Sequence, residues 1–134
     1  MPRVLIADKL SPAAIDIFKQ RGVDADVKTG LSKEELLKII NDYDGLAVRS
    51  ATKADKDVIA AAGNLKVIGR AGIGVDNVDI PAATSKGIVV MNTPFGNSIT
   101  TAEHAIAMMF APARQLPCGD VSTQAGKWEK NRFM

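Results

Sequence analysis

The 134-residue sequence predicts an α/β fold in which helices cover both faces of a five-stranded parallel sheet. Short aliphatic and β-branched runs alternate regularly with stretches of helical periodicity, and Gly or Pro residues separate them. Aromatic residues make up only 4% of the chain, so aliphatic side chains must build the core. Five strand–helix units in sequence are typical of a flavodoxin-like, doubly wound domain.

Residues that begin and end helices and strands identify the first two strands and the helix between them. Residues 3–8 predict a buried strand, and a helix follows that begins at Pro12, is capped by Ser11 and ends at Gly22. Residues 24–29 predict a weaker strand near an edge of the sheet. The apolar side of the helix that begins at Pro12 should consist of Ile15, Ile17 and Phe18.

The central units carry clear start signals. Ser32 and Glu35 have the spacing of a capping box and open a second helix. Residues 45–48 predict the third strand, and residues 54–62 predict a short helix that Gly63 ends. The residues expected to be buried in these two helices are Leu36, Leu37, Ile39, Ile40, Val58 and Ile59.

The last units complete the sheet. Residues 65–69 and 88–91 predict the fourth and fifth strands. Between them Asp79 caps a helix with Pro81 in its first turn, and Gly87 ends it. A long helix is expected over 98–115, and the change in composition just before it predicts a domain boundary near Asn97.

Composition excludes several classes of function. The net charge of +2 is too small, and too evenly spread, for a nucleic-acid or anionic-membrane surface. Cys118 is the only cysteine, so neither an internal disulfide nor a cysteine metal cluster can form. No membrane span or signal peptide is recognisable, and we expect a cytoplasmic protein.

Three polar segments follow the third, fourth and fifth predicted strands. They are Arg49–Ser50, residues 70–77 and residues 92–98. Ligands of doubly wound proteins bind beyond the carboxyl ends of the strands, so we expect the three segments to be neighbours at one edge of the sheet.

Each segment allows a functional and a purely structural interpretation. The planar guanidinium of Arg49 can bind a carboxylate or phosphate through two hydrogen bonds, with Ser50 as an additional hydroxyl donor. In the structural alternative, Arg49 forms an ion pair with an acidic residue on the surface. The Gly72–Ile73–Gly74 loop can bring backbone amides to an anion, or it is simply a tight turn. It is not a dinucleotide fingerprint, because Asn77 stands at the position of the third glycine.

The remaining polar candidates are weaker. Asn97 and Ser98 can cap the long helix, and His104 is expected on a helix surface or interface because no partner for catalysis or metal binding lies near it. A phosphoacceptor signalling domain is excluded, because Arg49 occupies the end of the third strand, where such a domain places an Asp. A noncatalytic small-ligand or dimerisation module remains an alternative.

Characteristic motifs occur in order at residues 48–52, 69–79, 90–98, 113–117 and 126–128. Together they resemble those of the D-isomer-specific 2-hydroxyacid dehydrogenases, and especially of members that act on 3-phospho-D-glycerate. The resemblance covers essentially the whole chain. It implies a two-domain enzyme that uses NAD to oxidise this phosphorylated hydroxy acid to 3-phosphohydroxypyruvate, on the route to L-serine. Relatives of the glyoxylate or hydroxypyruvate reductase type are the alternative.

The resemblance also implies roles for individual residues. It assigns residues 1–97 to a substrate-binding domain and residues 98–134 to the first helix and dimer arm of an NAD-binding domain. Two departures stand out: Ile73 replaces a hydroxyl residue that touches the cofactor in some relatives, and Pro112 should kink or break the long helix. The implied substrate-binding residues are Arg49, Ser50, Gly72, Ile73, Gly74 and Asn97, and the implied cofactor-binding residues are Ile73, Thr101 and Glu103.

The resemblance implies further machinery that has no counterpart in these residues. The glycine-rich cofactor turn and the catalytic Arg, Glu and His of the family have no match here, and His104 does not correspond to that His. We therefore expect a fragment of a homo-oligomeric enzyme that is inactive by itself, with no catalytic residue and no metal ligand of its own.

Overall fold

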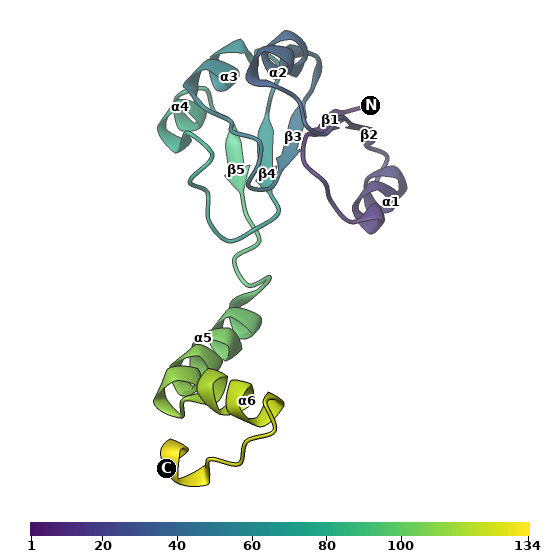
Figure 1. The fold of residues 1–134 in the computed structure, drawn as a ribbon. Helices are drawn as coiled ribbons and strands as arrows, with labels where there is room; N and C mark the ends of the chain where they lie inside the picture. The colour runs from purple at the N-terminus through teal and green to yellow at the C-terminus, as the bar shows by residue number, and fades with distance from the viewer. The chain divides into compact units, whose positions relative to one another are not determined.

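The computed structural model describes residues 1–134, which form two compact units, Met1–Gly96 and Asn97–Met134. The first unit contains a five-stranded, wholly parallel sheet with the strand order β2-β1-β3-β4-β5 (Figure 1). This order is typical of a flavodoxin-like, doubly wound domain, the fold class that the sequence predicted, and the weak second strand lies at an edge as expected. The strands are β1 (Arg3–Ile6), β2 (Asp24–Val27), β3 (Gly45–Val48), β4 (Val67–Arg70) and β5 (Val89–Met91).

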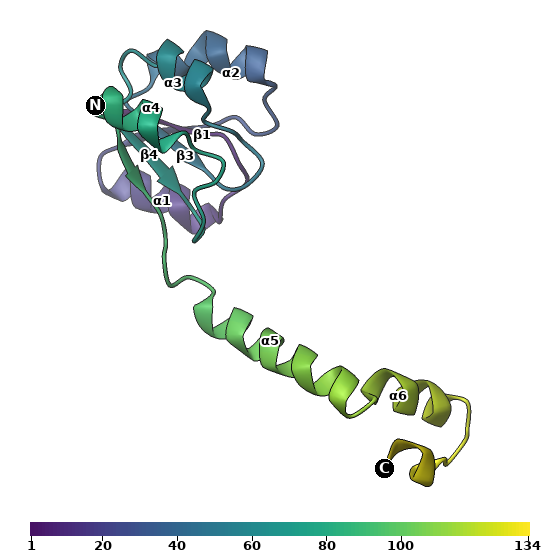
Figure 2. The ribbon, with the colours of Figure 1, turned by 90° about the vertical axis from the view of Figure 1, so that its left-hand side faces the viewer.

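Helices cover both faces of this sheet. Figure 2 shows α1 on one face and α2, α3 and α4 on the other. A short 3₁₀ helix, η1, continues directly from α2. The helices are α1 (Pro12–Gln20), α2 (Lys33–Ile39), η1 (Ile40–Asp42), α3 (Lys56–Ala61) and α4 (Ile80–Ser85).

The main core lies between the sheet and the group of three helices. Leu5, Leu46, Ile68 and Val90 occupy matching register positions on four adjacent strands, so their side chains share one face. Burying this aliphatic layer is the main stabilising contribution to the unit. The helices contribute Leu36, Ile40, Val58, Ile59 and Ala83 to the same cluster.

The capping predictions divide into confirmed and wrong ones. The capping box of α2 is present, with Glu35 N donating to Ser32 Oγ over 3.2 Å and Ser32 N donating to Glu35 Oε2 over 2.8 Å. Asp79 caps α4 through its bond from Ala82 N. Ser11, however, makes no side-chain bond to α1, although it occupies the N-cap position.

Several boundaries and one apolar face also differ from the sequence predictions. β1 and β2 each end two residues earlier than expected. α3 begins at Lys56, because Asp55 supplies the N-cap and Ala54 instead forms an isolated bridge with Val78. β4 starts two residues later than expected. In α1, Ile15 and Phe18 are partly buried, but Ile17 is 57% exposed and does not belong to the packed side.

The second unit is built from helices alone. α5 (Ser98–Ala113) runs without interruption through Pro112 and ends one residue later, where Arg114 N donates to Phe110 O. Asn97 stands at its N-cap without a side-chain cap bond, so the predicted capping role is wrong. The sequence analysis missed α6 (Leu116–Gln124) and the 3₁₀ helix η2 (Lys130–Phe133). None of the helices combines the length and apolar character needed to cross a membrane.

Candidate functional site

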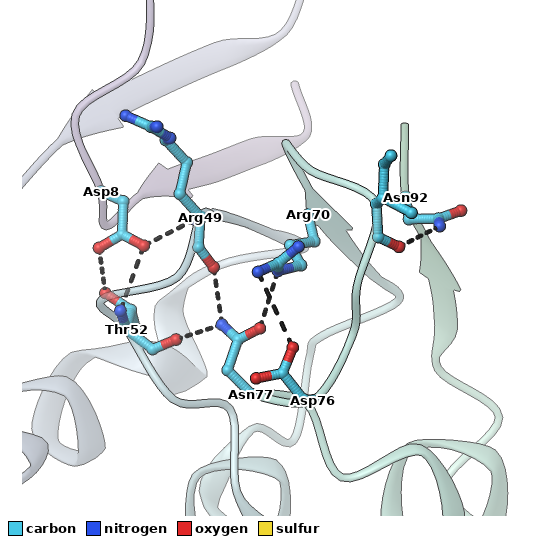
Figure 3. A network of polar contacts seen from close by, with 8 residues as sticks. Asp8, Arg49, Thr52, Arg70, Asp76, Asn77 and Asn92 are labelled. Carbon is cyan, nitrogen blue, oxygen red and sulfur yellow. Dashed lines mark hydrogen bonds and ion pairs between the residues drawn. The ribbon is translucent and has the colours of Figure 1, made fainter. Parts of the chain in front are cut away.

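The three polar segments meet at the carboxyl edge of the sheet, as the sequence predicted. Ala71 N donates to Val48 O over 2.8 Å and joins the segment after β4 to the end of β3. On the other side, Thr93 N donates to Gly72 O over 3.0 Å, and Asn92 Nδ2 donates to Ile73 O over 2.7 Å (Figure 3). Hydrogen bonds therefore connect the ends of β3, β4 and β5 into one continuous edge.

Arg49 presents a guanidinium group with almost no partner in the protein. Its only side-chain hydrogen bond is a long one, 3.4 Å from Nη1 to Lys9 O, and no carboxylate lies within ion-pair distance. The alternative in which a surface acid neutralises Arg49 is therefore not realised. Ser50 beside it is exposed as well. This leaves one bidentate cation and one hydroxyl free for an anion.

Asp8 holds the segment that carries Arg49, and the sequence analysis did not single it out. Its Oδ2 accepts from Arg49 N over 2.6 Å and from Thr52 N over 3.1 Å, and its Oδ1 accepts from Thr52 Oγ1 over 2.7 Å (Figure 3). Burial raises the pKa of the Asp8 carboxyl, but the bonds from Thr52 and the backbone of Arg49 and Ala51 outweigh it and hold that pKa below its ordinary value.

Asn77 lies in the segment 70–77 that was expected at this edge, but no role for its side chain was predicted from the sequence. Its side chain is buried and bridges two segments: Nδ2 donates to Arg49 O over 2.7 Å and to Thr52 O over 2.6 Å. Its Oδ1 accepts from Arg70 Nε over 2.9 Å. A signal was available, since Asp8, Arg70 and Asn77 are all polar residues at or near strand ends, where ligands of this fold gather.

The Gly72–Ile73–Gly74 loop does not use the left-handed freedom of glycine. Neither Gly72 nor Gly74 has a positive φ. The backbone N–H groups of Ile73 and Gly74 have no hydrogen-bond partner within the chain, so they are open to an external acceptor. The Ile73 side chain is 41% exposed and apolar.

The other predicted site residues belong to the second unit. Asn97, Thr101 and Glu103 are exposed there, and so is His104, as expected for a surface histidine. None of the four makes a side-chain bond or ion pair within the chain.

The edge of the sheet is thus equipped to bind and orient an anion. A free guanidinium, a hydroxyl and two open backbone amides are donors of the kind that hold carboxylates and phosphates. The buried carboxylate of this edge, Asp8, is not available to a substrate, because both of its oxygens accept bonds from the protein. Binding is the chemistry that this geometry supports.

The family comparison matches the sequence model of the D-isomer specific 2-hydroxyacid dehydrogenase catalytic domain to residues 4–127. The chain is 55% identical, over 132 residues, to a protein of Archaeoglobus fulgidus named D-3-phosphoglycerate dehydrogenase. That alignment covers 98% of this chain but 25% of the relative, so the chain spans about a quarter of the length of the curated relatives it matches.

Solved structures give the same fold. The PH0520 protein from Pyrococcus horikoshii superposes with a TM-score of 0.86 and 30% identity, covering 97% of this chain and 39% of that protein. The NAD⁺-bound 3-phosphoglycerate dehydrogenase of Entamoeba histolytica superposes with a TM-score of 0.72 and 34% identity, covering 82% and 38% of the two chains.

Proposed function

The chain belongs to the D-isomer-specific 2-hydroxyacid dehydrogenase family, and on that premise we propose that it forms the substrate-binding portion of a D-3-phosphoglycerate dehydrogenase. The complete enzyme would oxidise 3-phospho-D-glycerate to 3-phosphohydroxypyruvate with NAD, as a cytoplasmic homo-oligomer on the route to L-serine. Residues 98–134 would form the first helix and the dimer arm of its nucleotide domain. Support comes from the 50–55% identity to proteins of that name across nearly the whole chain.

The observation that carries the proposal is the free guanidinium of Arg49 at the carboxyl edge. An exposed Arg with no acidic partner, beside an exposed Ser50, suits a substrate with two anionic groups. The open amides of Ile73 and Gly74 would take the substrate carboxylate, and Asn97 would contribute a contact at the cleft. Arg49 and Ser50 bind and orient the substrate in this scheme, and neither takes part in proton transfer.

These residues do not form a site for NAD by themselves. No G-x-G-x-x-G turn leads into a helix to hold a pyrophosphate, and residues 92–98, directly after β5, contain no Asp or Glu to hold a ribose. NAD, when bound to the complete enzyme, supplies the hydride acceptor. We propose that, in this chain, only Ile73, Thr101 and Glu103 would contact the NAD that the complete enzyme binds.

The direct test is the substitution Arg49→Ala in the complete gene product. We expect the kcat/KM for 3-phosphoglycerate to fall. The fall should correspond to a loss of about 2–4 kcal/mol of transition-state binding free energy, the scale of a lost bidentate charge-assisted contact. Arg21→Ala is the matched control, since Arg21 is exposed at the end of α1 and forms no ion pair.

The same assay separates the proposal from its competitor. Glyoxylate and hydroxypyruvate carry no phosphate, so they should be poor substrates and should lose much less when Arg49 is replaced. An unchanged kcat/KM for 3-phosphoglycerate in Arg49→Ala, or a preference of the wild type for glyoxylate, would refute the assignment.

A further inference from the structure

Asn77 uses both of its side-chain N–H donors and its side-chain oxygen to join two loops. Its two N–H donors reach Arg49 O at 2.7 Å and Thr52 O at 2.6 Å, and its oxygen accepts from Arg70 Nε at 2.9 Å (Figure 3). The partners fix the orientation of the amide, because two carbonyls demand donors on one side and a guanidinium demands an acceptor on the other. Only 9% of the residue is exposed, so water does not compete for these bonds.

Arg70 lies against the glycine loop. Its side chain is 12% exposed, and its Nη2 is 3.9 Å from Asp76 Oδ1. A Cβ atom at Gly72 would stand 2.5 Å from Arg70 Nη1, and one at Gly74 would stand 3.7 Å from the same atom. Since Gly72 has no positive φ, its lack of a side chain serves to accommodate the guanidinium, whereas a Cβ atom at Gly74 would first meet Asp76 Oδ1 at 3.0 Å.

We propose that Asn77 and Arg70 are a pair of positioning residues that hold the Arg49–Thr52 loop at a fixed distance from the Gly72–Gly74 loop. The proposal rests on the proposed function only in that the two loops bind one substrate. Asn77 holds the Arg49–Thr52 loop by donating hydrogen bonds to its carbonyl groups, while the Arg70 side chain packs against the Gly72–Gly74 loop. The free guanidinium of Arg49 and the open amides of Ile73 and Gly74 thereby keep a constant spacing before a ligand arrives.

The substitution Asn77→Asp tests the pair with little change in shape. It replaces both donors by a carboxylate oxygen that faces the carbonyls of Arg49 and Thr52, which should push the first loop away. In the complete gene product we expect the KM for 3-phosphoglycerate to rise about tenfold, the scale of one to two lost buried hydrogen bonds. The KM for NAD and kcat should change less than threefold.

A purely structural role would give a different pattern. Loss of folded enzyme lowers kcat and leaves KM unchanged, so that result would overturn the proposal. A second readout needs no activity: in the 134-residue chain, hydrogen exchange at the amides of Arg49 and Thr52 should accelerate in Asn77→Asp. If the wild type fails to turn over 3-phosphoglycerate, the proposed function falls while this exchange result still decides the role of Asn77.

A double-mutant cycle tests the part assigned to Arg70. Gly72→Ala should raise the KM for 3-phosphoglycerate when Arg70 is present, because the new methyl group displaces the guanidinium. In an Arg70→Ala background the same change should add little. Gly69→Ala is the matched control, since a Cβ there meets nothing within 4 Å. Additive effects of Gly72→Ala and Arg70→Ala would show that the glycine has another purpose.

Discussion

Single polar residues beneath the sheet edge determine how the candidate site is presented. Asp8 is 5% exposed, and its two oxygens accept bonds from Arg49 N, Thr52 N and Thr52 Oγ1. A buried carboxylate is tolerated only when it is fully hydrogen-bonded, and here the donors come from the loop that carries Arg49. The same contacts that satisfy Asp8 therefore also order the loop.

This arrangement predicts how stability responds to acid. The folded chain lowers the pKa of Asp8 below its ordinary 3.8, so ionised Asp8 stabilises the fold above that pH. This contribution is lost as the pH falls from about that value through the lower pKa of the folded state. In Asp8→Asn we expect the urea midpoint to depend less steeply on pH below 4, and stability at pH 7 to drop by roughly 1–2 kcal/mol.

The control for this experiment is Asp16→Asn, at an exposed position on α1 that makes no hydrogen bond. Its pH profile should follow that of the wild type. Parallel profiles for Asp8→Asn and the wild type would contradict the role given to Asp8.

Individual helices differ in how they begin, and this difference is measurable. α2 has a complete capping box, whereas α1 begins at a Ser whose side chain caps nothing. Ser32→Ala should therefore cost about 0.5–2 kcal/mol of unfolding free energy. Ser11→Ala serves as the matched control and should change stability by less than about 0.5 kcal/mol. Equal losses in the two variants, measured by urea denaturation, would mean that the capping box contributes nothing specific.

The second unit exposes many large apolar side chains. No residue of α5 is buried, and Trp128 is 84% exposed. Surfaces of this kind associate with apolar partners. We predict that the 134-residue chain self-associates, by exchange of α5 between copies. Light scattering over a range of concentrations measures this, and a monomer at high concentration would rule it out. The exposed apolar residues of α5 are Ile99, Ile106, Met108, Met109 and Phe110.

For the molecule as a whole, binding without turnover is expected. The chain can present donors to an anion, but hydrogen bonds from the protein occupy the Asp8 carboxylate, and no glycine-rich turn leads into a helix to hold a pyrophosphate. We predict that the purified 134-residue chain does not oxidise 3-phosphoglycerate with NAD and does not bind NADH in the micromolar range. Fluorescence titration with NADH and an assay free of host enzyme are the measurements. Micromolar affinity for NADH, or genuine turnover of 3-phosphoglycerate, would disprove the prediction that these residues only bind the substrate.

Local sequence determined the order and type of nearly all elements in residues 1–96. Alternating aliphatic runs, capping residues such as Ser32 and Asp79, and terminating glycines such as Gly22 act over a few residues, so they can be read directly. α6 was not predicted, because Gly119 in its interior disfavours a helix locally. The placement of Arg49 and the glycine loop at one edge also followed from the sequence, since parallel strands end together.

Only the tertiary structure decided which polar residues support that edge. Asp8 and Arg49 are 41 residues apart, and Asn77 lies 28 residues beyond Arg49, so no local pattern could pair them. The tertiary structure also decided that Arg49 lacks an acidic partner and that the missing side chain of Gly72 leaves room for the Arg70 guanidinium. Both features depend on the positions of side chains that are distant in the sequence. Helix starts and strand runs are local interactions, whereas the burial of a charge and the space left for a guanidinium arise only when the sheet is assembled.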